Sequence, residues 1–485
     1  MHFRPSLLSL LRFMPALVVL ALVASGAEHR IVILHTNDLH DHVRAGDNRR
    51  GGLPFVAGYV RQVRAAEPAV LLVDAGDVIE KGDLVAFRSG GVMTYEAMGR
   101  IGYDGVAVGN HDFDDQPLER IRRFEAALGQ ELLCLNIVRT DGRPIFAASR
   151  VVERGGLRIG LIGLIVPRKP EQGGLDFKAS GAALALEAER LRATTDLIVA
   201  VCHESVSKCA EWARAAPAVS VFVSGHSHQV LAEPVLVPET GAIIVQAGSY
   251  ARWVGRLELV VSASERRVVR HEGRLVPMDH DTIAPDKAML TWVREREAEL
   301  APEANQFVGE NPAELDGFAV ARIGAEALRR AAGAEIGFCH PYQVIRNLLP
   351  AGRVDVNAVF KTGGHRGHDV VVAELTGMEV EAYVNALVSL QREPPEWAGF
   401  RVNRTSVPGG GVKWGTDLEA TRRYRVVVPK IEWETRLLRL ADRVRERDAA
   451  NPLAARAFTA EPVAVNFTDA TVVYLREVLA AGETW

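Results

Sequence analysis

The sequence predicts an α/β fold, and three observations point to it. From Arg30 to about Pro277, short apolar runs alternate with helix-like stretches. The apolar runs are continuous, which suits strands covered on both faces, and strands that alternate with helices indicate βα units. Polar residues follow directly where several of these runs end. Because ligands bind at the carboxyl ends of strands in open α/β sheets, we expect these polar residues to converge on one sheet edge.

The elements can be assigned in chain order. The expected strands are the apolar runs at residues 31–34, 70–73, 105–108, 160–165, 197–201 and 221–223. Helix-like stretches lie between them, for example at residues 56–66 and 182–192. A charged stretch at residues 285–300 is expected to be a linker helix. The remainder, from about residue 307, has the pattern of a second α/β or α+β region.

Length and composition limit the possible functions. A chain of 485 residues exceeds one ordinary hydrophobic core, so two or three domains are expected. The hydrophobic content of 48% and the charged content of 24% are typical of a globular protein. The net charge of −4 does not favour non-specific nucleic-acid binding, which needs a basic surface, so no nucleic-acid partner is expected. The oligomeric state stays open.

The N-terminus predicts export. Arg4 and Arg12 precede an apolar run at residues 13–24, and small residues follow at 24–27. This order is typical of a signal peptide, here residues 1–27, and the alternative is an uncleaved anchor. The run is shorter than the roughly 20 residues of a spanning helix, so we expect no stable membrane span after cleavage. The mature protein is then periplasmic or secreted.

The four cysteines are Cys134, Cys202, Cys209 and Cys339. Export permits disulfides, but the spacing is not that of a zinc ribbon, and a chain of this size needs no covalent staple. We expect buried free thiols, with a Cys202–Cys209 bridge as the alternative.

The polar residues that follow the predicted strands in the sequence form a set of potential metal ligands. They are Asp38, His40, Asp77, Asn110, His203, His226 and His228. Mixed oxygen and nitrogen donors suit Mn²⁺, Fe or Zn²⁺ better than all-oxygen or thiolate sites do. Seven ligands with one shared carboxylate are enough for two divalent ions, and such ion pairs serve phosphoryl transfer.

Five sequence blocks carry a family resemblance. They are Thr36-Asn-Asp-Leu-His40, Asp74-Ala-Gly-Asp77, Gly109-Asn-His-Asp-Phe-Asp114, Cys202-His-Glu204 and Gly225-His-Ser-His228. In this order they resemble the motifs of calcineurin-like metallophosphoesterases, and Gln246-Ala-Gly-Ser-Tyr250 adds a likeness to the 5′-nucleotidase branch. The resemblance implies a four-layer αββα sandwich followed by a smaller α/β (α+β) C-terminal domain. It divides the chain into a catalytic domain at 28–278, a linker helix at 279–304 and a substrate domain at 305–485.

The resemblance also implies roles for individual residues. One metal would be held by Asp38, His40, Asp77 and His228, and the other by Asp77, Asn110, His203 and His226. A metal-bridging hydroxide would be the nucleophile. His111 would face the phosphoryl oxygens, and Asp114 would fix its ring.

The C-terminal part departs from the 5′-nucleotidase pattern. Arg346 matches an arginine of the family, and Arg366 stands where the family has an aromatic residue, so both are candidates for substrate binding. The two rings that stack the base are missing, with Tyr342 and Trp433 as possible replacements. Base stacking contributes about 1–3 kcal/mol per base, so nucleoside recognition should be weaker here.

These observations predict a dinuclear metal-dependent phosphoester hydrolase, most similar to a 5′-nucleotidase. Its partner would be a small-molecule phosphate ester, with a nucleotide as one candidate. The alternatives are a cyclic phosphodiesterase or nucleotide-sugar hydrolase, a thiosulfohydrolase-like enzyme on the same metals, or a non-catalytic binding protein. The last is disfavoured because every expected ligand is present.

Overall fold

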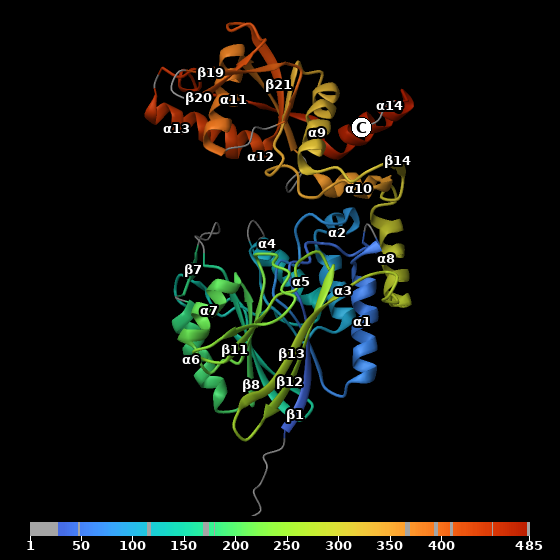
Figure 1. Ribbon diagram of the computed structural model, residues 1–485, viewed down its shortest axis with the longest axis vertical. Helices are drawn as coiled ribbons and strands as arrows, with labels where there is room; N and C mark the ends of the chain where they lie inside the picture. The colour runs from blue at the N-terminus through green and yellow to red at the C-terminus, as the bar shows by residue number, and fades with distance from the viewer. Residues whose placement is uncertain are drawn as a thin grey trace, which may run out of the picture.

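The computed structural model describes residues 28–46, 49–113, 118–167, 174–178, 180–363, 369–391, 396–407, 411–448 and 450–482. The chain forms two lobes, and helix α8 (Lys287–Leu300) runs along one side between them (Figure 1). Asp286 begins this helix, because its side chain accepts a hydrogen bond from the backbone N–H of Met289. The predicted signal peptide at residues 1–27 lies outside the described residues.

The N-terminal lobe contains two large sheets. The first has the order β13-β12-β1-β2-β3 and consists of β1 (Glu28–Thr36), β2 (Val70–Asp74), β3 (Gly105–Val106), β12 (Trp253–Ser262) and β13 (Arg267–Pro277). The second has the order β10-β11-β9-β8-β6-β5 and consists of β5 (Ser149–Arg154), β6 (Leu157–Ile165), β8 (Leu197–His203), β9 (Val221–Ser224), β10 (Val235–Val237) and β11 (Ala242–Val245). A small separate pair, β4 (Ile137–Arg139) and β7 (Leu175–Phe177), lies beside them.

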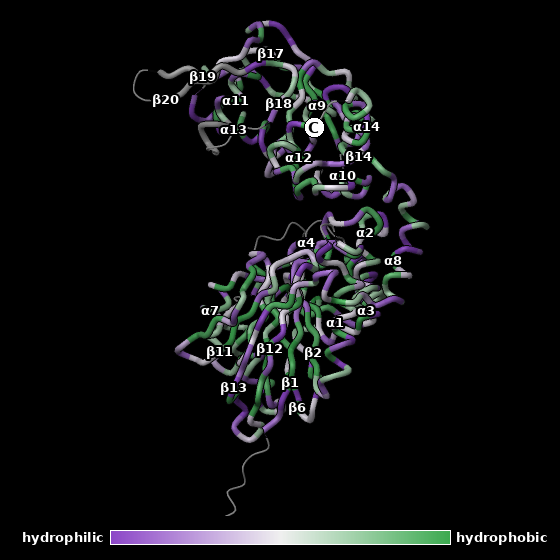
Figure 2. Tube along the Cα trace, turned by 45° about the vertical axis from the view of Figure 1, so that its right-hand side comes forward, coloured by the Kyte–Doolittle hydropathy of each residue, from purple (hydrophilic) through white to green (hydrophobic). Residues whose placement is uncertain are grey.

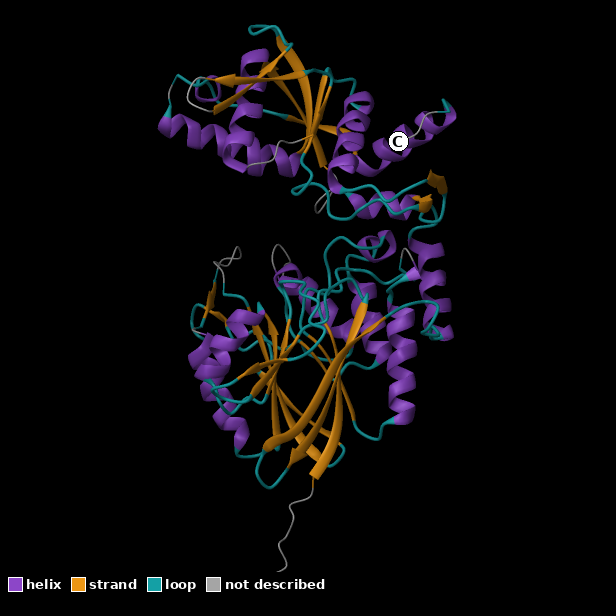
Figure 3. Ribbon diagram, viewed as in Figure 1, coloured by secondary structure: helices purple, strands orange, loops and turns teal. Residues whose placement is uncertain are grey.

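The two sheets pack face to face with helices outside both, as Figure 3 shows. In β1, Ile31 and Ile33 pack into the core between the sheets, whereas Val32 and Leu34 pack toward the outer helices. This alternation follows from the two-residue period of a strand, and it explains why the run is apolar throughout. Figure 2 shows the hydrophobic stretches along β1, β2 and β12 at the centre of the lobe. The predicted four-layer αββα sandwich is thus confirmed.

The outer layers are helical. The first sheet is covered by α1 (Leu53–Ala66), α3 (Val92–Ile101) and α5 (Leu118–Leu128), and the second by α6 (Ser180–Arg192) and α7 (Val206–Ala215). Two short helices, α2 (Leu84–Arg88) and α4 (Asn110–Phe113), lie at the end of the lobe that faces the other lobe (Figure 1).

All six predicted strands are present, but they do not share one sheet edge. The runs at 31–34, 70–73 and 105–108 belong to the first sheet, and those at 160–165, 197–201 and 221–223 belong to the second. The polar residues still meet, because β1, β2 and β3 are parallel, as are β6, β8 and β9, and both sets end at the same end of the sandwich.

The C-terminal lobe is built around one mixed sheet of order β18-β15-β21-β17-β22. Its strands are β15 (Ile336–Cys339), β17 (Asp369–Thr376), β18 (Glu396–Ala398), β21 (Arg423–Pro429) and β22 (Glu461–Asn466). Two further pairs are β14 (Phe307–Asn311) with β16 (Gly352–Asp355), and β19 (Val402–Val407) with β20 (Gly411–Thr416).

Helices cover both faces of this sheet. One face packs on α9 (Gly317–Ala331), α10 (Val356–Thr362) and α14 (Phe467–Ala480). The other packs on α11 (Gly377–Gln391), a π-helical turn (Trp433–Leu438) that follows α12 (Lys430–Glu432), α13 (Arg439–Arg447) and a short 3₁₀ turn (Pro452–Ala454). The predicted second α/β domain is therefore present.

The two lobes share a buried contact. Asn357 of α10 accepts a hydrogen bond from the backbone N–H of Leu84 and donates one to Asp83, at 2.8 and 2.9 Å. Nearby, the rings of Phe87 and Phe360 pack 5.2 Å apart.

All four cysteines are buried free thiols, as predicted. None of the helices in the described part of the chain is long and apolar enough to cross a membrane.

Candidate metal centre

The predicted ligands lie at the ends of β1, β2, β3, β8 and β9. Five of them are on the loops after β1, β2 and β9, His203 is the last residue of β8, and Asn110 begins α4 after β3. Five of them adopt a left-handed backbone: Asp38 (φ 52°), His40 (φ 44°), Asp77 (φ 54°), His226 (φ 65°) and His228 (φ 52°). Each such residue costs of order 1–3 kcal/mol and persists only where its surroundings fix it. Here the first two loops hold one another, because Asp38 N–H donates to the Gly76 carbonyl at 2.9 Å and His40 N–H to the Asp77 carbonyl at 3.0 Å.

Asp38, His40 and His228 form the first group of donors, whose ligand atoms all lie within 4.8 Å of one another. The Nε2 atoms of His40 and His228 are 3.1 Å apart, and Asp38 Oδ1 lies 3.2 Å from His228 Nε2. Asp38 is fully buried, and Asn37 orients it by donating from its side chain at 2.7 Å.

Asp77, His203 and His226 form the second group, again within 4.8 Å. His203 Nε2 lies 3.0 Å from Asp77 Oδ2 and 3.1 Å from Asn110 Oδ1. Its Nδ1 lies 2.9 Å from the Ala75 carbonyl, so that nitrogen carries the proton and Nε2 faces the centre.

Asp77 lies between the two groups. Its Oδ2 is 3.0 Å from His203 Nε2 and 3.9 Å from His40 Nε2, so one carboxylate adjoins both sets of donors. The adjacent loop approaches too closely for a side chain, since a Cβ on Gly109 would lie 2.0 Å from the Asp77 backbone nitrogen. The structure thus brings together all seven residues that the sequence predicted as ligands.

The carboxylate of Asp77 and the imidazole of His203 interact strongly in this buried centre. Burial disfavours the charged form of His203, but the Asp77 carboxylate outweighs burial and raises the pKa of His203 to about 10. Burial also raises the pKa of Asp77, but His203, His111 and His40 outweigh burial and hold that pKa well below its usual range. The buried carboxylates therefore favour a positive charge at this place.

His111 faces the same centre, with its Nε2 4.0 Å from Asp77 Oδ2. Burial lowers its pKa to about 4, despite the nearby carboxylates of Asp77 and Glu80. The predicted partner Asp114 lies outside the described residues, so the pairing of His111 with Asp114 stays a prediction.

Glu80 is a member of the site that the sequence did not single out. Its carboxylate lies 3.3 Å from His40 Nδ1, 3.6 Å from His111 Nδ1 and 3.0 Å from Arg346 Nη2. The one available signal was its position three residues after Asp77, in the same loop.

The C-terminal lobe contributes Arg346, which reaches the centre through that ion pair with Glu80. Arg366 lies outside the described residues. Trp433, one possible replacement for a base-stacking ring, is buried in the core that packs on α11, and its accessible edge lines a separate pocket with Asp369 and Lys430. Tyr342 is 57% exposed and meets Phe318 edge to face.

Two divalent ions fit this donor set. Carboxylate, amide and imidazole donors converge from separate segments of the chain. His203 donates from Nδ1 to the Ala75 carbonyl, so its Nε2 points toward the other donors. Five of the seven proposed ligands have a left-handed backbone, which is expected where geometry is imposed for function.

Comparison with known proteins agrees with this geometry. Residues 31–230 match the calcineurin-like phosphoesterase family. The chain is 26% identical to protein UshA of Yersinia enterocolitica over 82% of its length and 84% of that protein. It is 25% identical to a 5′-nucleotidase of Vibrio cholerae, over 83% and 84% of the two chains.

A solved structure of a 5′-nucleotidase precursor has a similar fold. A crystal structure of a 5′-nucleotidase precursor from Thermus thermophilus superposes with a TM-score of 0.71 at 22% identity, covering 93% of this chain and 96% of the other. Calcineurin-like phosphoesterases use two divalent metals, and the two donor groups lie within the matched residues. Residues 31–230 are thus a calcineurin-like phosphoesterase domain, and the chain is a metal-dependent phosphoester hydrolase related to the 5′-nucleotidases.

Proposed function

We propose that this protein is a two-metal phosphomonoesterase of the 5′-nucleotidase type, exported to the periplasm or secreted. The observation that carries the proposal is the pair of donor groups that adjoin one carboxylate, Asp77. Relatives named UshA and 5′-nucleotidase, aligned over most of their length, support a small phosphate ester, including nucleotides, as substrate.

The ligand assignment follows the two groups. Asp38, His40 and His228 hold one ion and Asn110, His203 and His226 the other, with Asp77 shared. We propose Mn²⁺, Zn²⁺ or Fe, because imidazole donors outnumber carboxylates in the set. Two such ions, when bound, neutralise phosphoryl charge and make water nucleophilic near neutral pH.

The chain's own residues position the ester. His111, beside Asp77, is placed to donate a hydrogen bond to the phosphoryl or leaving oxygen. Arg346 lies at the same place from the other lobe and offers a planar fork to phosphate oxygens. Arg366 is proposed as a second contact on the leaving group.

The proposed function assigns a role to each of three regions of the chain. Residues 28–278 are the catalytic domain, residues 279–304 the linker and residues 305–485 the substrate domain. The missing stacking rings favour substrates in which the base contributes little to binding.

The test is hydrolysis by the mature chain with Mn²⁺, with Zn²⁺ and after chelation. The panel holds p-nitrophenyl phosphate, its bis-ester, AMP, a cyclic nucleotide and a nucleotide sugar. We expect metal-dependent turnover of the monoesters above the bis-ester and the cyclic nucleotide. Faster turnover of a diester would reject the monoesterase assignment, and no turnover despite two bound ions would favour a binding protein.

A further inference from the structure

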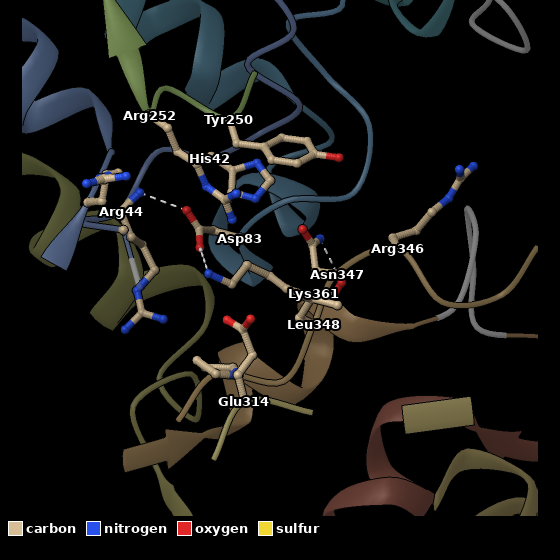
Figure 4. A pocket seen from close by; sticks show the side chains of 13 residues that line it. His42, Arg44, Asp83, Tyr250, Arg252, Glu314, Arg346, Asn347, Leu348 and Lys361 are labelled. Carbon is tan, nitrogen blue, oxygen red and sulfur yellow. Dashed lines mark hydrogen bonds and ion pairs between the residues drawn. The ribbon is translucent and has the colours of Figure 1, made fainter. Parts of the chain in front are cut away.

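A cavity of about 390 Å³ lies between the two lobes, next to the metal centre. Figure 4 shows His42, Tyr250 and Arg252 on one wall, from the N-terminal lobe, and Glu314, Leu348 and Lys361 on the opposite wall. Five cationic side chains and two carboxylates line it, so the cavity is basic in a protein whose net charge is −4.

Three of the five cations are already neutralised. Arg44 binds Glu297 and Asp355 at 2.8 and 3.3 Å, Lys361 lies 3.7 Å from Asp83, and Arg346 pairs with Glu80. The two others are Arg50 and Arg252. In the part of the chain that the structure describes, neither of their guanidinium groups forms an ion pair or a hydrogen bond.

Each of these two arginines is instead held against an aromatic ring. The Arg50 guanidinium carbon lies 5.5 Å from the centre of the Trp253 ring, and that of Arg252 lies 5.4 Å from the centre of the Tyr250 ring. Ring contact restricts a flexible side chain while its N–H edges stay available for a planar oxyanion. Both rings come from the start of β12 and the residues just before it, so this segment holds Arg252 of its own loop and Arg50 of the loop before α1.

Tyr250 connects this cavity to the metal centre. Its ring contacts those of the proposed ligands His40 and His228, with centres 5.7 and 5.6 Å apart, and it contacts Arg252 as well. A molecule whose ester lies at the metals can therefore extend past Tyr250 toward Arg50 and Arg252.

We propose that Arg50 and Arg252 form a second anion subsite, which selects phosphate esters whose leaving group carries a further phosphate or carboxylate. The inference rests on the proposed phosphoesterase function. It identifies the anionic end of the substrate, rather than a stacked base, as the feature that is recognised beyond the ester.

Phenyl phosphate, 4-carboxyphenyl phosphate and 1,4-phenylene bisphosphate test this selectivity in the metal-loaded full chain. We expect kcat/KM for the two anionic esters to exceed that for phenyl phosphate by about 10- to 100-fold, the range for charge-assisted hydrogen bonds. A preference for the bisphosphate alone identifies phosphate as the second group. The Arg50→Gln/Arg252→Gln double variant should lose the preference and keep its turnover of phenyl phosphate.

Arg270→Gln is the matched control, because Arg270 is an exposed arginine of β13 at the opposite end of the sheet from Trp253. It removes a like charge and should keep the preference. Equal kcat/KM for all three esters in the wild type, or a preference that survives in the double variant, overturns the subsite.

Titration with inorganic phosphate separates this inference from the proposed function. If no ester is hydrolysed, the phosphoesterase proposal fails, but calorimetry with the metal-free chain still examines the cavity. Binding that disappears in the double variant and persists in Arg270→Gln supports the subsite. Absence of binding in the wild type, or binding unchanged in the double variant, overturns it.

Discussion

At the scale of single residues, Glu80 is the side chain whose loss should be most informative. One carboxylate lies beside His40, His111 and Arg346, at 3.3, 3.6 and 3.0 Å. Glu80→Gln keeps the shape and removes the negative charge that lies beside both imidazoles. Losing such a partner typically lowers metal affinity or activity about 10- to 100-fold. We expect a fall of this size in kcat and in metal affinity, measured by turnover and by metal titration.

Glu204→Gln is the control for that experiment. Glu204 also lies beside a proposed ligand, His203, but its carboxylate accepts its hydrogen bond from the neighbouring Ser205 N–H. This variant should keep kcat within about twofold, because the Glu204 carboxylate bonds to the Ser205 backbone and forms no ion pair with His40, His111 or Arg346. Equal losses in the two variants would show that Glu80 acts only through the general charge of the site.

His111 and Asp77 should separate catalysis from metal binding. His111→Ala removes a side chain that lies beside both donor groups, and we expect both ions to stay while kcat falls about 10²- to 10⁴-fold, the range for acid–base residues. Asp77→Ala removes the shared carboxylate and should lose metal. Elemental analysis and turnover of both variants decide this, and two retained ions in Asp77→Ala would contradict the shared role.

At the scale of elements, the six strands predicted from apolar runs are present, whereas the interior strands β11 and β12 and the edge strand β13 were not predicted. The run at 31–34 was visible because both faces of β1 are covered. β13 was missed, because it lies at the edge of the first sheet, alternates between partly covered and exposed residues, and carries Arg267, Arg270 and Arg274. The two-sheet arrangement also could not be derived from apolar runs alone, since a covered strand has the same pattern in one sheet or two.

The metal centre was predictable for a related reason. The proposed ligands lie at the ends of buried strands or shortly after them, so their approximate place is fixed once the strands are recognised. Arg50 and Arg252 were not predictable in this way. Their significance depends on which rings they contact and on which other cations are neutralised, and both depend on how the lobes pack.

The short helix α12 carries a pH-dependent contribution to stability. Burial raises the pKa of Glu432 to about 8 from 4.5, and Tyr383 lies 3.2 Å from its Oε1. The folded state therefore keeps a proton that the unfolded state releases between these values. This contribution is fully present below about pH 4.5 and is lost as the pH rises toward 8, at about 1.4 kcal/mol per pH unit.

Glu432→Gln should remove that dependence, because the amide does not titrate. We expect the free energy of unfolding, measured with denaturant from pH 5 to 8, to fall less steeply than in the wild type. The neighbouring Glu434→Gln is the control, since Glu434 is exposed. If both variants keep the wild-type slope, Glu432 is not the group that titrates.

At the scale of the whole molecule, the two lobes are joined as one folding unit. A single hydrophobic cluster includes Val56 of α1, Val85 of α2, Phe360 of α10 and Phe467 of α14. The proposed function also uses both lobes, since Arg346 reaches Glu80 from the C-terminal side. We therefore expect stability and turnover to change together when the contact between the lobes is weakened.

Asn357→Ala tests this coupling. Asn357 is fully buried, and its loss leaves the Leu84 N–H without its acceptor and Asp83 without one donor, which costs about 1–3 kcal/mol. Because both contacts cross between the lobes, we expect calorimetry to resolve two unfolding transitions and kcat/KM to fall. Asn136→Ala is the matched control, since Asn136 is equally buried but bonds to Ile165 within the N-terminal lobe. It should lower the transition temperature without splitting the transition. A single unsplit transition in Asn357→Ala, with unchanged kcat/KM, would mean that the lobes are held together by their apolar contacts alone.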